Sequence, residues 1–181
     1  MSEAQTICIL AVSGSLRQVS SNTTLLQAAI ALSPPRVAIK LYSGLGRLPH
    51  FNPDLELEPL AVTDLRQQLN WADGLIISSP EYAHGVPGVL KNALDWLVSG
   101  EEFVGKPVAV FNASPRAVHA QASLTEIVIT MAGRIVPEAS VTIPLLGRKL
   151  DTAALVANSD LSEQVKTAIT TFAAAIEQFS A

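Results

Sequence analysis

The stretch SSPEYAHGVPGVLKNALDWL occupies residues 78–97 and decides how this chain folds. The apolar run before it, residues 74–77, is long enough for a buried strand. Pro87 suits the start of a helix, where its missing N–H has no partner to lose. Apolar residues then recur at helical spacing, at Val86, Leu90, Ala93, Leu94 and Leu97. The stretch therefore predicts a strand, a loop and a helix that packs one face on a sheet.

The loop in this stretch carries residues that fix its shape, namely Pro80, Gly85, Pro87 and Gly88. Gly85 has no side chain, so a flat ligand could approach the backbone amides there. The loop therefore favours a planar ligand.

The composition favours one domain over residues 1–181. Apolar residues make up 49% of the chain, enough for a sizeable core without disulfides or a metal. Twelve basic and sixteen acidic residues give a net charge of −4, too weak for a nucleic-acid surface. We therefore expect a small-molecule partner, no nucleic acid and no metal site.

The sequence gives no sign of a membrane partner. No segment approaches the roughly 20 apolar residues of a membrane span, and residues 1–5 place no basic region before a hydrophobic one. The single cysteine, Cys8, lies in an apolar run and reads as an inert thiol. These features predict a cytoplasmic protein.

Strands and helices alternate along the rest of the chain. Further strands are expected at residues 6–12, 36–41 and 108–111, with a fifth divided by Pro137 into 134–136 and 141–143. Further helices are expected after Asn22 or Thr23 as N-cap, over 62–71, over 124–131 with Gly133 as C-cap, and over 161–179 capped by Ser159 or Asp160. Such alternation gives right-handed crossovers and a parallel sheet covered on both faces.

Five such units predict an α/β fold of the flavodoxin-like type. This is a doubly wound five-stranded parallel sheet of order 2-1-3-4-5 with helices on both faces. In that order the first and third strands are neighbours, and a crevice opens beyond their carboxyl ends. The loops that follow these two strands are residues 13–23 and 78–88.

The loop at residues 13–23, SGSLRQVSSNT, has the chemistry that a phosphate needs. It offers hydroxyls, Arg17 and the backbone amides at the start of a helix. It lacks both a Gly-Lys-Ser/Thr ending and G-x-G-x-x-G, so a monophosphate fits better than a triphosphate or a dinucleotide. The alternative is that these residues only cap the helix. The position beside the third strand favours the phosphate, and the loop at Ser114 would close the third side.

The chain resembles the NADPH-dependent FMN reductase family, which includes quinone, chromate and azo-dye reductases of flavodoxin-like fold. The resemblance covers about the first two thirds of the chain. It is carried by Gly14-Ser15-Leu16-Arg17 with Ser21-Asn22, by Ala72-Asp73-Gly74, by Pro80-Glu81-Tyr82 and by Pro87-Gly88 with Leu90-Lys91-Asn92-Ala93-Leu94-Asp95-Trp96.

This resemblance implies FMN as cofactor and NADPH as electron donor. It implies that the FMN phosphate is held by Ser15, Arg17, Ser21 and Asn22, with Ser20 or Thr23 beside them. It implies that the isoalloxazine is lined by Pro80, Glu81, Tyr82 and Gly85. Residues 114–120 replace a segment that is often glycine-rich in the family, so only Ser114 is carried over there. Arg116 and His119 remain unassigned. The resemblance also implies a homodimer or homotetramer, with residues 43–59 and Trp96 as interface material.

Such an enzyme needs no catalytic acid, base or nucleophile from the chain, because the flavin carries the hydride chemistry. We expect an NAD(P)H oxidoreductase that passes the hydride by a ping-pong mechanism to a small acceptor: a quinone, flavin, chromate or azo compound. His84 is either an exposed loop residue or a proton donor to the acceptor.

Two other functions remain open. One is a flavodoxin-type single-electron carrier, which would bind FMN but serve a protein partner. The other is a hydrolase or glycosyl-transferring enzyme on the same fold. The sequence also leaves open the physiological acceptor and the choice between NADPH and NADH.

Overall fold

A parallel sheet forms the centre of the chain in the computed structural model, which describes residues 6–145, 147–148 and 150–180. Its strands are β1 (Ile7–Ser13), β2 (Val37–Leu41), β3 (Gly74–Ser78), β4 (Pro107–Asn112), β5 (Arg134–Ile135) and β6 (Val141–Thr142). They run in the order β2-β1-β3-β4-β5, and β6 also pairs with β4. This confirms the predicted flavodoxin-like fold, including the fifth strand divided at Pro137.

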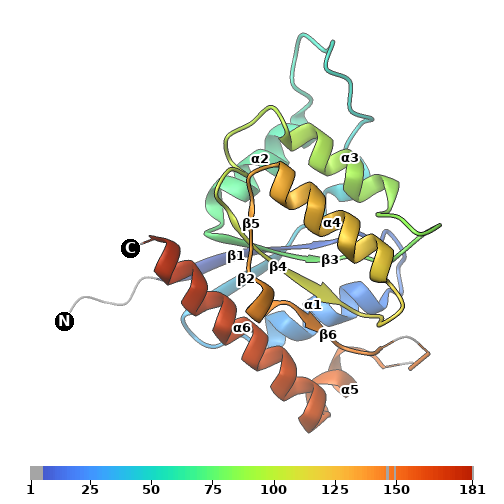
Figure 1. Cartoon of the computed structure of the whole chain (residues 1–181), viewed down its shortest axis with the longest axis vertical. Coiled ribbons are helices and arrows are strands. Elements are labelled where there is room, and N and C mark those ends of the chain that lie inside the picture. The colour runs from blue at the N-terminus through green and yellow to red at the C-terminus, as the bar shows by residue number, and fades with distance from the viewer. Residues whose placement is uncertain (1–5, 146, 149, 181) are drawn as a thin grey trace.

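Helices cover both faces of the sheet, with α1, α5 and α6 on one side and α2, α3 and α4 on the other (Figure 1). They are α1 (Ser21–Ala31), α2 (Leu60–Trp71), α3 (Gly88–Leu97), α4 (Val118–Thr130), α5 (Thr152–Ala157) and α6 (Ser159–Ser180), with single 3-10 turns η1 (Leu45–Arg47) and η2 (Pro137–Ala139). Successive strand residues serve opposite faces: Ile9 and Ala11 pack towards α1 and α6, whereas Leu10 and Val12 pack towards α2 and α3. Burial on both faces explains why β1, β3 and β4 are continuous, mostly apolar runs.

The carboxyl ends of β1 and β3 lie at the same level. Ser13 is in register with Ser78, and the Gly14 N–H donates to the Ser78 carbonyl at 2.8 Å. A Cβ on Gly14 would lie 2.8 Å from Ser79 Oγ and 3.1 Å from Leu90 Cδ2. Glycine at this position therefore lets the loops after the two strands start side by side, as the sequence predicts.

Two predicted N-caps are wrong. Ser20, not Asn22 or Thr23, caps α1, because its Oγ accepts the Thr23 N–H at 3.4 Å. At α6 the Asn158 carboxamide accepts the Leu161 N–H at 3.0 Å, whereas Ser159 already lies in the helix. The sequence analysis did not anticipate the short helix α5, which ends at Ala157 with Asn158 as its C-cap.

The predicted C-cap of α4 is also wrong. Met131 is the C-cap, and the left-handed residue after it is Ala132, with φ of 59°. The Gly133 N–H donates back to the Val128 carbonyl at 2.9 Å. Glycine is needed at position 133 for space, since a Cβ there would lie 2.7 Å from Phe103 Cε1.

The long connection at residues 43–59 is tied to α3 near its middle. The Trp96 indole N–H and the Asn92 amide both donate to the Pro49 carbonyl, at 2.8 and 2.9 Å. The Phe51 ring packs edge-on against Trp96, with ring centroids 5.1 Å apart. Trp96 is buried by these contacts within its own chain, which leaves little of it for a second subunit.

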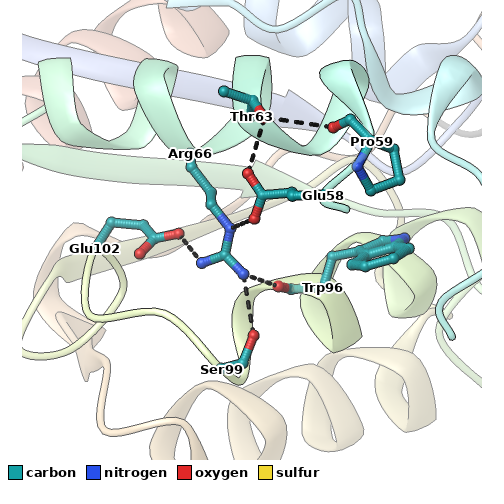
Figure 2. A network of polar contacts seen from close by, with 7 residues as sticks. All are labelled: Glu58, Pro59, Thr63, Arg66, Trp96, Ser99 and Glu102. Carbon is teal, nitrogen blue, oxygen red and sulfur yellow. Dashed lines mark hydrogen bonds and ion pairs between the residues drawn. The ribbon is translucent and has the colours of Figure 1, made fainter. Parts of the chain in front are cut away.

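A second set of polar contacts ties the end of this connection to α3 (Figure 2). Arg66 on α2 lies with its Nε 2.7 Å from Glu58 Oε2 and also pairs with Glu102. Its guanidinium donates to the Trp96 carbonyl at 2.7 Å and to Ser99 Oγ at 3.1 Å. The segment between the two ties projects from the body of the molecule (Figure 1).

Among the described residues, no helix is both long and apolar enough to cross a membrane.

Candidate functional site

A cavity of about 300 Å³ opens beyond the carboxyl ends of β1, β3 and β4. Its wall comes from the three loops that follow these strands: Ser15, Arg17, Ser20, Ser21, Asn22, Ser79, Pro80, Glu81, Tyr82, Ala113, Ser114, Arg116 and Ala117. We call it the first cavity. It lies at the point where the strand order reverses, which is where ligands bind in open α/β sheets.

Most of the residues singled out in the sequence lie together on this wall. They are Ser15, Arg17, Ser21, Asn22, Pro80, Glu81, Tyr82 and Ser114. Thr23 instead lines a neighbouring cavity, and Gly85 does not belong to the wall. Sequence reasoning missed Ser79, Ala113 and Ala117 and left Arg116 unassigned. Ser79 and Ala113 directly follow strand ends, and that position is the signal that could have found them.

The amino end of α1 presents donors to the first cavity. Ser20 satisfies the Thr23 and Thr24 amides, but among the described residues the N–H groups of Ser21 and Asn22 have no acceptor. The first turn contains no acidic side chain. Free amides at the positive end of an eleven-residue helix form a site for an anion such as a phosphate.

Side-chain hydrogen bonds hold this helix end against the sheet. The Asn22 carboxamide oxygen accepts from Ser78 Oγ at 3.0 Å, and Thr23 Oγ1 lies 2.8 Å from Ser13 Oγ. Asn22 therefore lines the first cavity, but its side-chain oxygen is already hydrogen-bonded to β3. The Thr23 hydroxyl is likewise hydrogen-bonded to β1. These bonds fix the free amides in place before any ligand arrives.

The loop after β3 contains a tight turn. Tyr82 and Gly85 exchange backbone hydrogen bonds, at 3.1 Å from the Tyr82 N–H and 3.0 Å from the Gly85 N–H. The two residues between them, Ala83 and His84, have φ of 50° and 58°, left-handed values that are unfavourable for residues with side chains. A Cβ on Gly85 would meet only the Tyr82 carbonyl, at 3.8 Å, so one side of the turn is open.

Glu81 ties this turn to α4. Its Oε2 accepts the Ala120 N–H at 2.9 Å, which supplies a cap that Ala117 cannot provide. This backbone hydrogen bond, with smaller contributions from the His119 N–H and the two nearby histidines, lowers the pKa of the Glu81 carboxyl. The Glu81 carboxylate is therefore hydrogen-bonded to α4, so a ligand would meet the backbone of residue 81 and not its side chain.

Two histidines lie over Glu81, outside the wall of the first cavity. The His84 and His119 rings meet edge to face, with centroids 4.5 Å apart, and His84 Nδ1 lies 3.4 Å from Glu81 Oε1. The His84 side chain is 77% exposed. This placement fits the interpretation of His84 as an exposed loop residue.

This chain belongs to the NADPH-dependent FMN reductase family, whose model it matches over residues 7–146. It is 43% identical over 112 residues to an NAD(P)H-dependent FMN reductase of Pseudomonas aeruginosa, a match that covers 60% of each chain. It is 32% identical over 111 residues to a quinone reductase of Escherichia coli, with 59% of each chain covered. The matched region thus spans about three fifths of the length of these relatives.

A solved structure extends the likeness to nearly the whole chain. A flavoenzyme NAD(P)H:(acceptor) oxidoreductase from Paracoccus denitrificans superposes with a TM-score of 0.86 at 26% identity, covering 96% of this chain and 99% of that one. The predicted family is therefore confirmed. Its membership supports FMN as the cofactor and NAD(P)H as the electron donor, and the hydroxyls, Arg17 and free amides of the first cavity fit such a phosphate-bearing group.

The contact between Glu81 and α4 predicts a pH-dependent stability. A carboxyl with a lowered pKa stabilises the fold while it is ionised, and that contribution is lost as the pH falls through the lowered pKa. We expect Glu81→Gln to lower the melting temperature at neutral pH. The gap to the wild type should close between about pH 5 and about pH 3. Glu163→Gln, on the exposed face of α6, is the control; a gap for Glu81→Gln that stays constant down to about pH 3 would contradict the assignment.

Proposed function

We propose that this chain is an FMN-dependent oxidoreductase that takes a hydride from NAD(P)H and delivers it to a small acceptor. A quinone, a flavin, chromate or an azo compound would suit an open site of this kind. The observation that carries the proposal is the first cavity. Free helix amides, hydroxyls and two arginines without a partner among the described residues, Arg17 and Arg116, meet there beside the hydrogen-bonded turn at residues 82–85.

Each part of the wall has a role in this proposal. Ser15, Arg17, Ser21 and the amides of Ser21 and Asn22 would hold the phosphate. The backbone of residues 80–82 and Gly85 would lie along the isoalloxazine, with Ser114 closing the third side. Bound FMN would supply the hydride chemistry. The chain would bind the flavin, orient the nicotinamide and the acceptor against it and shield one face of the ring. It would need no nucleophile of its own.

The shape of the site implies that the two substrates bind in turn. The turn at residues 82–85, held by its two backbone hydrogen bonds, would cover one face of a planar ring. Only the other face would stay open, so a nicotinamide and a flat acceptor would have to occupy the same place one after the other. This arrangement supports a ping-pong mechanism.

The phosphate cradle predicts that the chain binds FMN more tightly than riboflavin, which lacks the phosphate. Arg17→Ala should weaken the binding of FMN by about 1.5–3 kcal/mol, the range for hydrogen bonds to charged groups. The same substitution should leave the binding of riboflavin almost unaffected. Fluorescence titration of both flavins measures this, with Arg36→Ala as the control because Arg36 pairs with Glu177 at the opposite edge of the sheet. Equal affinities for FMN and riboflavin would refute the cradle.

The shared open face predicts parallel double-reciprocal plots and loss of the yellow flavin colour on anaerobic addition of NADPH without acceptor. His84→Asn should change the rate by less than about tenfold, or ~1.4 kcal/mol of barrier, because the histidine lies outside the wall. A protein that holds FMN, stays yellow with both nicotinamides and takes single electrons from a reductase would instead be an electron carrier.

We also propose that the chain forms a homodimer or homotetramer through the projecting part of residues 43–59. In this segment Leu57 is 85% exposed and Leu55 is 46% exposed. Leu60, the first residue of α2 directly after the segment, is 87% exposed. Such a group of exposed leucines marks an association surface. Leu57→Glu should shift the sedimentation coefficient towards that of a monomer at micromolar concentration. A wild-type protein that already sediments as a monomer would contradict this proposal.

A further inference from the structure

A second cavity, of about 670 Å³, adjoins the first across the loop between β1 and α1. Its wall consists of Arg17, Gln18, Val19, Ser20, Ser21, Thr23, Thr24, Gln27, Gly147, Arg148, Leu150, Asp151 and Thr152. Arg17, Ser20 and Ser21 belong to both cavities. A ligand that fills the first cavity therefore lies one loop away from a ligand in the second.

The unpaired cations of the described chain gather at these two cavities. The other described lysines and arginines have partners within the protein: Arg36, Arg47, Arg66, Lys91 and Lys166 pair with carboxylates, Lys40 and Lys106 donate to oxygens, and Arg134 lies over the Phe179 ring. Among described residues, the guanidinium groups of Arg17, Arg116 and Arg148 have no such partner. Arg17 and Arg116 line the first cavity, whereas Arg148 lines only the second.

This distribution leaves arginines at both cavities that could bind two separate anionic groups. FMN carries one phosphate, which the amides of α1 and Arg17 would hold. Arg148 lies outside that wall, so it is left for a different phosphate. A guanidinium matches a phosphate because it can donate two parallel hydrogen bonds to it.

We propose that the second cavity binds the adenosine end of NADPH and that Arg148 contacts the 2′-phosphate. This inference rests on the proposed function, which puts the nicotinamide over the first cavity. The remaining part of the same dinucleotide must then lie nearby, and the adjoining cavity has the size of a small-molecule site, ~300–1,000 Å³. NADH has no 2′-phosphate, so Arg148 would determine the preference between the two nicotinamides.

The remaining polar groups of the second cavity agree with this ligand. Asp151 is its one described acidic residue, and its carboxylate accepts the Ala154 N–H at 2.8 Å as the cap of α5. Thr152 Oγ1 donates to Gln27 Oε1 at 3.0 Å, which ties the start of α5 to α1 and leaves the Gln27 amide N–H groups for a ligand. Thr24 adds a hydroxyl suited to a ribose or base edge.

Binding of nucleotide fragments tests the site without requiring turnover. FMN-loaded full-length chain is titrated by calorimetry with adenosine 2′,5′-bisphosphate and with 5′-AMP. We expect the wild type to prefer the bisphosphate. Arg148→Ala should weaken binding of the bisphosphate at least about tenfold, because its contact with the 2′-phosphate is lost. The same substitution should weaken binding of 5′-AMP, which lacks that phosphate, less than about threefold. Arg148→Lys should retain part of the preference, and Arg36→Ala should retain all of it.

Turnover then separates the two proposals. Arg148→Ala should lower kcat/KM for NADPH, through KM, by the factor seen in binding and leave kcat/KM for NADH and the affinity for FMN unchanged. A wild type that binds both fragments equally or neither, or an Arg148→Ala variant that keeps the preference or loses FMN affinity, would overturn the assignment of the second cavity. Failure of the proposed function would appear differently, as a flavin that neither nicotinamide bleaches.

Discussion

The pairing of β1 with β3 is the constraint on which the site depends. It brings together two chain segments 65 residues apart, in a register that ends both strands at Ser13 and Ser78. The Gly14 N–H bond to the Ser78 carbonyl and the Asn22 bond to Ser78 Oγ continue this pairing into the loops. Since parallel strands share one carboxyl edge, every loop that follows them opens to the same side. The wall of the first cavity is a consequence of that register.

The parts of this arrangement that follow from local chemistry could be predicted from the sequence. Apolar runs located β1, β3 and β4, alternating apolar residues located β2, and Pro137 located the break in the fifth strand. The cap of α1 could not be located, because Ser20, Asn22 and Thr23 are all good capping residues and contacts with β1 and β3 decide among them. The role of Gly133 was misjudged for a similar reason: the space beside Phe103, not the backbone angle, requires glycine there.

Charge is a second property that the sequence does not reveal by itself. The chain has a net charge of −4, yet the arginines left unpaired in its described part line the two cavities at the amino end of α1. Whether a cation serves the fold or a ligand depends on which carboxylates the fold brings near it. Arg66 is close in sequence to Glu58 but also meets Glu102, and only the packing of α2 against α3 shows that it is structural (Figure 2).

The segment after β4 affects the site through Glu81 as well as directly. Residues 114–120 differ from the glycine-rich pattern expected there. They form the loop before α4 and the first residues of that helix, whose Ala120 N–H donates to the Glu81 carboxylate. That bond holds one end of a turn in which Ala83 and His84 adopt unfavourable left-handed angles. Backbone of this kind persists only where neighbouring contacts fix it, here the Tyr82–Gly85 exchange and the Glu81 contact. The sequence of α4 thereby helps to set the shape of the β3–α3 loop, although the two segments are far apart in the chain.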